Sequence, residues 1–166
     1  PSLPMWMIFN AGAGLSLAIS GVPTALFIRN GQMSVSTTTR LARVDSVAAG
    51  LRIKNVSGLA KRGGGFNSSN SSEGYVIAAR QAIVNGVTND VAMTVLPDAP
   101  IDYATGLQIP TIAVATAGGV SVIKDDGTVV DLTTTSAAIA FRVYFTDDNK
   151  LSYVYGEATA GVRVDS

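Results

Sequence analysis

The sequence contains no cysteine and no histidine among its 166 residues. Without cysteine, disulfide bonds, thiolate zinc sites and haem attachment are excluded. Without histidine, the chain lacks the commonest metal ligand and the commonest general base at neutral pH, and a Ser-His-Asp triad is impossible. We therefore expect no catalytic, cofactor-binding or metal-binding residues and no cofactor.

Charged residues are also scarce, at 14%, whereas hydrophobic residues make up 47% of the chain. Seventeen glycines accompany a sequence dominated by Val, Ala, Ser and Thr. This mixture favours β-strands joined by turns of small residues over packed helices. The apolar content is sufficient for one ordinary core, so we predict a single all-β domain.

The few charges are unevenly distributed although the net charge is zero. Residues 29–80 hold eight basic and two acidic side chains, whereas residues 81–166 hold four basic and ten acidic ones. One interpretation is that the two halves attract each other, within one molecule or head to tail between copies. The alternative is that the two surfaces simply differ in composition.

The first 28 residues carry no charge, and their length would suit a transmembrane helix. Turn-forming residues interrupt the stretch, namely Asn10, Gly12, Gly14, Gly21 and Pro23. No basic region precedes the apolar run, as a signal peptide would require. We therefore predict strands at 5–10 and 15–20 and no membrane span.

Hairpin signals continue along the chain. Asn30-Gly31, the strongest short hairpin signal, separates the strand candidates 24–30 and 31–38. Polar and apolar residues alternate after Arg40, which predicts a strand, with a helix through 40–49 as the alternative. Residues 61–74, "KRGGGFNSSNSSEG", are rich in Gly, Ser and Asn, and we expect a mobile loop there.

Residues 111–132, "TIAVATAGGVSVIKDDGTVVDL", contain three apolar runs divided by two tight turns. The glycines of these turns supply the positive φ that tight hairpins need. The segment therefore predicts a three-stranded meander. A similar series follows at 138–146, 150–157 and 161–166, where strand candidates are again separated by turn residues.

Two of these series are 50 residues apart, measured from Val91 to Phe141. Units of 40–50 residues with four short strands are typical of β-propeller blades, whose sheets cover each other's apolar faces. We predict about three to four blades, approximately 1–38, 39–86, 87–135 and 136–166, forming a partial ring or a ring closed by oligomerisation. The alternative is a β-sandwich.

Residues 87–132 resemble a family of tailed-bacteriophage virion proteins, the marine-type tail-fibre or tail-associated proteins with propeller-like repeats. The stretches "PTIAVAT" and "GGVSVIKDDGTVVD" are most alike. The resemblance implies a virion protein that is assembled in the host cytoplasm and contacts other virion or tail proteins, with a host surface glycan as a further candidate partner. Family members are longer, which suggests that this chain is part of a longer protein.

The resemblance implies adhesion or particle structure and offers no catalytic residues. We therefore expect a non-enzymatic homo-oligomeric protein that presents a rigid β-surface for tail structure or host attachment. One alternative is a carbohydrate-active enzyme, a glycosidase or polysaccharide depolymerase, which would need two carboxyl groups converging from separate segments. Another is a capsid-decorating protein with a sandwich fold.

Acidic residues and tyrosines are the candidate binding residues. Asp125, Asp126, Asp147 and Asp148 lie in predicted turns, where they either fit the backbone chemistry of the turn or bind a hard cation. Tyr144, Tyr153 and Tyr155 lie close together in sequence. Exposed tyrosines could stack on sugar rings or anchor a partner, whereas buried ones belong to the core.

Basic residues from Arg40 to Arg62 form the remaining candidate surface. Such a patch could meet the phosphates of nucleic acid or lipopolysaccharide. Aromatic residues are not interleaved with it, which argues against single-stranded nucleic acid. We therefore predict a solvated strand face and no nucleic-acid partner.

Overall fold

The computed structural model describes residues 21–45, 50–62, 76–78, 81–103, 105–133, 139–156 and 162–165. This part of the chain forms fifteen strands and no α-helix, and its three main sheets are antiparallel meanders. The all-β prediction is therefore confirmed. No helix in these ranges is long and apolar enough to cross a membrane. The strands predicted at 5–10 and 15–20, and most of the loop predicted at 61–74, lie outside the described residues.

The first sheet contains six strands, which neighbour one another in chain order. They are β1 (Pro23–Arg29), β2 (Gln32–Thr37), β3 (Leu41–Asp45), β4 (Gly50–Asn55), β5 (Gly58–Arg62) and β6 (Val76–Ala78). The predicted hairpin joins β1 to β2. Asn30 and Gly31 both have positive φ, at 47° and 71°, as a type I′ turn requires.

Strand β3 settles the ambiguity after Arg40 in favour of a strand, at least for residues 41–45. Its side chains alternate between two faces, and both Leu41 and Ala42 are buried. Strands β2 and β3 pair directly, from Gln32↔Asp45 to Ser36↔Leu41. One sheet therefore runs across the expected boundary between the units 1–38 and 39–86.

The second sheet has the order β12-β11-β10-β7. Its strands are β7 (Thr88–Thr94), β10 (Thr111–Thr116), β11 (Gly119–Ile123) and β12 (Val129–Leu132). Between β7 and β10 the chain makes a small hairpin of β8 (Ile101–Asp102) and β9 (Leu107–Gln108). The meander predicted at 111–132 is thus present, and Gly119 and Gly127 have the positive φ that its turns require.

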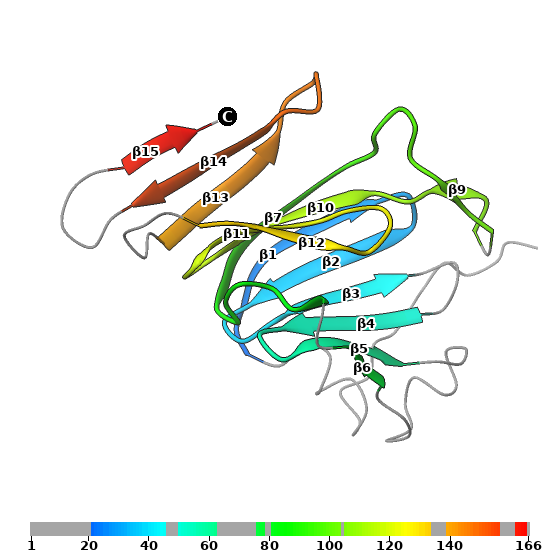
Figure 1. Cartoon of the computed structure of the whole chain (residues 1–166), viewed down its shortest axis with the longest axis horizontal. Coiled ribbons are helices and arrows are strands. Elements are labelled where there is room, and N and C mark those ends of the chain that lie inside the picture. Colours follow the sequence, from blue (N-terminus) through cyan, green and yellow to red (C-terminus); the bar gives the residue numbers. More distant parts are fainter. Residues whose placement is uncertain are drawn as a thin grey trace, which may run out of the picture.

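The third sheet has the order β13-β14-β15, with β13 (Ile139–Phe145), β14 (Leu151–Gly156) and β15 (Val162–Asp165). The three sheets are stacked in the order of the chain (Figure 1). The six-stranded sheet lies against one face of the four-stranded sheet, and β13 lies against the other. The four-stranded sheet is therefore the middle layer of the stack.

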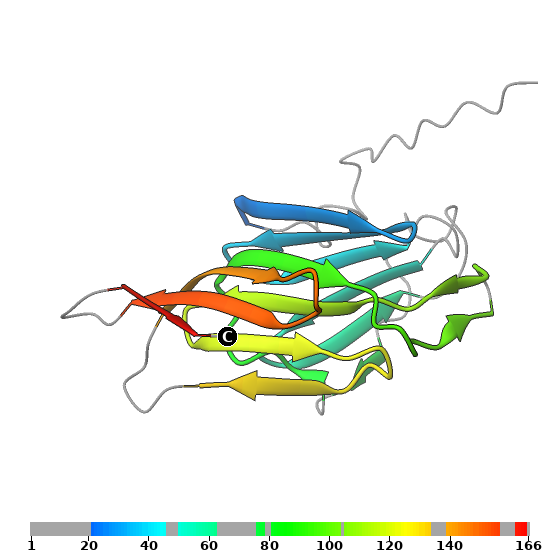
Figure 2. The ribbon, with the colours of Figure 1, turned by 90° about the horizontal axis from the view of Figure 1, so that it is seen from above.

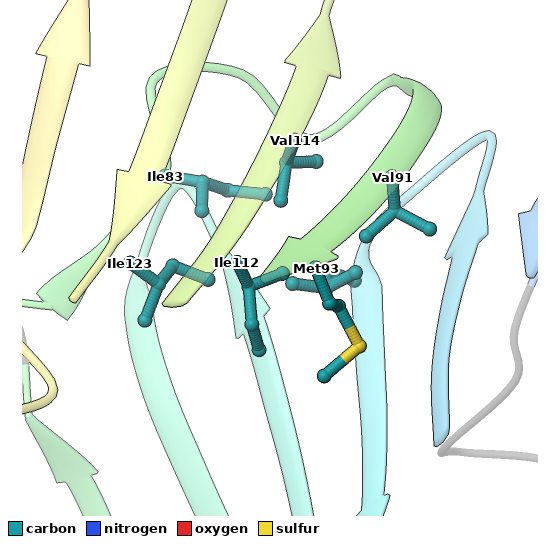
Figure 3. Packing of buried hydrophobic residues seen from close by; sticks show 7 residues of the cluster. Ile83, Val91, Met93, Ile112, Val114 and Ile123 are labelled. Atoms are coloured by element: carbon teal, nitrogen blue, oxygen red, sulfur yellow. The ribbon is translucent and has the colours of Figure 1, made fainter. Parts of the chain in front are cut away.

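Two apolar clusters separate these layers. The first lies between the six- and four-stranded sheets, where residues of β7, β10 and β11 gather with Ile83 and Leu41 (Figure 3). The second lies between the four- and three-stranded sheets and is built largely from alanines of β7 and β10 with Val143. In β10, Ile112 and Val114 enter the first cluster, and Ala113 enters the second. This double burial explains why residues 112–115, "IAVA", are apolar without interruption.

The first strand of each sheet lies on one shared side of the stack. Strands β1, β7 and β13 are edge strands of their respective sheets, and β7 contacts both of the others. In Figure 2, β1 and β7 lie toward the same upper edge. We call this side, formed by β1, β7 and β13, the rim. The sheets of the described ranges do not form a closed ring.

Polar contacts join the layers along the rim. The Thr24 hydroxyl of β1 donates a 2.7 Å hydrogen bond to the carbonyl oxygen of Thr88 in β7. On the other face, the Asn89 side-chain amide donates a 2.7 Å hydrogen bond to the carbonyl oxygen of Ala140 in β13. Each bond joins one sheet to the next, so all three strands of the rim are connected across the stack.

Candidate functional site

A groove of about 470 Å³ runs along the rim, beside β7 and between β1 and β13. Its volume lies within the range of small-molecule sites, roughly 300–1,000 Å³. Apolar residues of the three strands line its sides, among them Leu26, Phe27 and Phe145. Leu26 is 57% exposed, so apolar surface remains open to solvent there.

An aromatic ring and several polar groups lie at one end of this rim groove. Tyr144 lines the groove and is 48% exposed, so its ring is accessible. Asp147 and Asn149 follow in the turn after β13 and also line the groove. The hydroxyl group of Thr94 donates a 2.5 Å hydrogen bond to the side-chain oxygen of Asn149, which holds the turn against β7.

Asp90 supplies a carboxylate on the floor of the groove. Its side-chain oxygens accept hydrogen bonds from its neighbour Val91 N–H, at 3.0 Å, and from Val143 N–H, at 3.2 Å. The Arg142 guanidinium lies 3.9 Å from the same carboxylate and is largely exposed. Asp90 thereby joins β7 to β13 and has a structural role.

A second hollow, of about 100 Å³, opens between the six- and four-stranded sheets. Three basic residues of β3 and β4 line it, namely Arg43, Arg52 and Lys54. Three acidic residues from the other half of the chain line it as well, namely Asp102, Asp125 and Asp126. The fold therefore brings residues of the basic and acidic halves of the sequence to one place, which we call the charged pocket.

Arg43 is the most perturbed group of the charged pocket. Burial, and after it the positive charge of Arg52, lower the pKa of its guanidinium to about 10, against the opposing effects of Asp45 and Asp102. Arg52 lies directly across from Arg43 in the register of β3 and β4. The half-buried guanidinium of Arg43 thus lies beside a second positive charge, which disfavours the charged form of Arg43.

Lys54 is almost completely buried, with 7% of its surface exposed. Its ammonium group donates a 3.0 Å hydrogen bond to the carbonyl oxygen of Gln81. The predicted solvated strand face is therefore wrong for Lys54. The reason is that Leu41, Arg43 and Lys54 share the face of the sheet that the second sheet covers.

The two predicted acidic turns are stabilised by their own hydrogen bonds. Asp126 accepts hydrogen bonds from the hydroxyl and the N–H of Thr128, at 2.6 and 2.8 Å, and these bonds lower its pKa. Asp148 accepts a hydrogen bond from Thr146 and lies 2.7 Å from the Lys150 ammonium, and both partners lower its pKa. This is the turn chemistry that the sequence suggested.

The three tyrosines do not form one surface. Tyr155 is 7% exposed, and Tyr153 packs against the second apolar cluster. Their ring centroids are 6.0 Å apart with a tilt of 34°. The predicted shared face of β14 is therefore present, with Tyr155 buried and Tyr153 partly buried. Tyr144 alone of the three offers an exposed ring.

The predicted site residues therefore separate into two places. Tyr144 and Asp147 line the rim groove, whereas Asp125 and Asp126 line the charged pocket. The sequence reasoning missed Arg43 as a pocket residue. A usable signal was present, because Leu41 lies two positions before Arg43 and a buried leucine predicts that Arg43 points toward the core as well.

The described residues contain no group of three or more acidic side chains placed to hold a metal ion. Asp102 and the Asp125-Asp126 pair do reach one pocket from separate segments. A glycosidase general acid requires a raised pKa, whereas that of Asp126 is lowered.

Comparison of the chain with protein-family models, with curated proteins and with solved structures found no match.

Proposed function

We propose that the protein is a non-enzymatic virion component of a tailed bacteriophage, acting in tail structure or host attachment. The observation that carries this proposal is the rim, where a groove lies on three edge strands held by a stack of sheets. Such a surface is rigid because its middle sheet is packed on both faces. Rigid presentation suits a protein that must resist shear during adsorption. The resemblance of residues 87–132 supports the viral assignment.

We propose further that the three sheets correspond to consecutive propeller-type blades. Blades of a propeller stack face to face and begin at a common inner edge. The stacking order, and the adjacency of β1, β7 and β13, support this arrangement. On this view further copies of the chain complete the ring, and the rim groove faces its channel. A strictly monomeric molecular mass in solution would argue against closure by oligomerisation.

The viral assignment is tested by the composition of virus particles. Density-purified particles from the source of this sequence are digested and analysed by mass spectrometry, beside the lysate of infected cells. We expect peptides of this chain to be enriched in the particle fraction with those of other tail proteins. Peptides confined to the lysate would refute a virion role.

The attachment role is tested by binding to bacterial surface polysaccharides on an array. We expect the Tyr144→Ala variant to lose binding, because the exposed ring offers a flat apolar face to a sugar. Phe141→Ala is the matched control, since Phe141 is 46% exposed on the same strand and does not line the groove. Equal loss in both variants would assign the effect to strand β13 and not to the groove.

One observation favours a second candidate, a carbohydrate-active enzyme, because Asp102 and Asp125 line one pocket from separate segments. The arrayed polysaccharides are incubated with the protein, and new reducing ends are measured. Cleavage that disappears in the Asp102→Asn variant would favour this enzyme and overturn the non-enzymatic proposal. Intact polysaccharide throughout would support attachment without catalysis.

A further inference from the structure

The charged pocket takes its positive and its negative groups from different elements of the fold. Its cationic side is formed by the antiparallel pair β3 and β4, where Arg43 lies across from Arg52 and Lys54 lies across from Leu41. Within the described residues, neither arginine side chain makes a hydrogen bond or an ion pair. A half-buried guanidinium group such as that of Arg43 normally has hydrogen-bonded acceptors, so their absence at Arg43 needs an explanation, whereas Arg52 is exposed.

Among the described residues, no carboxylate on the acidic side of the pocket forms an ion pair with either arginine. The pKa of Asp126 is lowered by hydrogen bonds from Thr128 and by the charge of Lys124, and both residues belong to its own turn. Asp45 and Asp102 raise the pKa of Arg43, but burial and the charge of Arg52 lower it by more. The space between the two sides is about 100 Å³, which is room for several water-sized groups. The pocket is thus preorganised for an anion on one side and for hydrogen-bond donors on the other.

We propose that the charged pocket binds the acid end of an acidic sugar, a carboxylate flanked by hydroxyl groups as in a hexuronic acid. Arg43 and Arg52 bind the carboxylate, because two guanidinium groups present paired N–H donors in a geometry that carboxylates match. Asp102 and Asp126 accept hydrogen bonds from the neighbouring hydroxyl groups. The buried ammonium of Lys54 adds positive charge to the floor.

The chemistry of the pocket distinguishes this ligand from simpler ones. A neutral sugar leaves the two guanidinium groups without an acceptor. An inorganic anion such as sulfate accepts hydrogen bonds from the guanidinium groups but has no hydrogen-bond donor for the carboxylates. The negative charge of the carboxylates then opposes its binding. The inference concerns a different surface from the rim groove and does not rest on the attachment proposal.

The experiment is a titration of the full chain with glucuronate, galacturonate, glucose and sulfate, followed by calorimetry and by amide NMR shifts. We expect saturable binding of at least one uronate, at least about tenfold tighter than binding of glucose or sulfate. Shifts are expected at β3, β4 and the turn around Gly127, and not at the rim. Absence of saturable uronate binding, or equal binding of sulfate and uronate, overturns the proposal.

Variants localise the binding. Arg52→Gln, at an exposed position of the pocket, is expected to weaken uronate binding about 10- to 100-fold, and Arg43→Gln at least as much. Arg142→Gln is the matched control, because it removes an exposed arginine on β13. Amide spectra show whether each variant is folded. If Arg43→Gln does not fold, Arg52→Gln still tests the proposal. Unchanged affinity in a folded Arg52→Gln variant refutes the assignment.

Discussion

The hydroxyl oxygen of Thr88, in β7, accepts a 2.8 Å hydrogen bond from the backbone N–H of Thr37, in β2. The same hydroxyl group donates to the Thr37 carbonyl oxygen, at 2.7 Å, or to the Arg40 carbonyl oxygen, at 3.0 Å. Thr88 is completely buried. One hydroxyl group therefore ties the end of strand β2 in the six-stranded sheet to the start of strand β7 in the four-stranded sheet, across 51 residues of sequence.

Replacing Thr88 by Val is expected to lower the free energy of unfolding by about 1–3 kcal/mol, because buried backbone groups lose a partner while the shape is kept. Urea denaturation measures the change. Thr88→Ser keeps the hydroxyl group and should retain the hydrogen bonds. Because Val keeps the methyl group and the shape of Thr, a Thr88→Val variant as stable as the parent would show that these hydrogen bonds add no net stability.

Gly119, at the start of β11, is expected to tolerate no side chain. Its φ is +123°, and a Cβ atom would lie 2.4 Å from the carbonyl oxygen of Leu132 in the neighbouring strand. Gly119→Ala should therefore destabilise the protein by about 2–4 kcal/mol, from backbone strain and overpacking together. Gly106→Ala is the control, because φ is +68° but no atom lies within 4 Å of its Cβ position. It should cost only about 1 kcal/mol.

Ala113, in β10, sets the distance between the second and third sheets. It is completely buried and packs in a cluster that contains Ala92, Ala115 and Val143. Ala113→Leu should destabilise the protein by about 1–3 kcal/mol, because a tightly packed layer has no room for the larger side chain. Thermal unfolding measures the change, and hydrogen exchange should rise in β13 and β14. Unchanged exchange there would mean that the third sheet does not depend on this contact.

Asp126 is expected to titrate below the usual range of aspartate. Its pKa is lowered chiefly by the hydrogen bond from the Thr128 hydroxyl group and then by that from the Thr128 N–H. Because the folded-state pKa lies below the unfolded one, the ionised form stabilises the fold above about pH 4, and this stabilisation is lost as the pH falls through the folded pKa. NMR titration of Thr128→Val should show a higher pKa for Asp126. An unchanged pKa would assign the shift to the backbone bond.

Arg43 is expected to reduce stability in the absence of a ligand. Because burial and Arg52 lower its pKa to about 10, the charged form is disfavoured in the folded protein. Arg43→Met keeps the length of the side chain and removes the charge, and it should raise the free energy of unfolding by on the order of 1 kcal/mol. Arg142→Met, at an exposed position, should change it by less than about 0.5 kcal/mol. A destabilised Arg43→Met variant would show that the charge is compensated.

Local structure could be predicted from short patterns. The Asn30-Gly31 turn, the meander at 111–132 and the strands from Ile139 onward are specified by neighbouring residues, since glycine and asparagine tolerate positive φ and alternation selects strands. The continuous apolar run of β10 is typical of a strand buried on both faces, as this strand is. These features depend on contacts within about ten residues, which a single sequence displays.

Only the tertiary structure decided which surfaces meet. The pairing of β2 with β3, the stacking of three sheets, and the convergence of Arg43 and Asp125 on one pocket depend on contacts between residues far apart in the chain. Residue type reveals neither the partner of a strand edge nor the face that a neighbouring sheet covers. For this reason Lys54 was predicted at the surface and is buried, and Tyr155 belongs to the core while Tyr144 remains exposed.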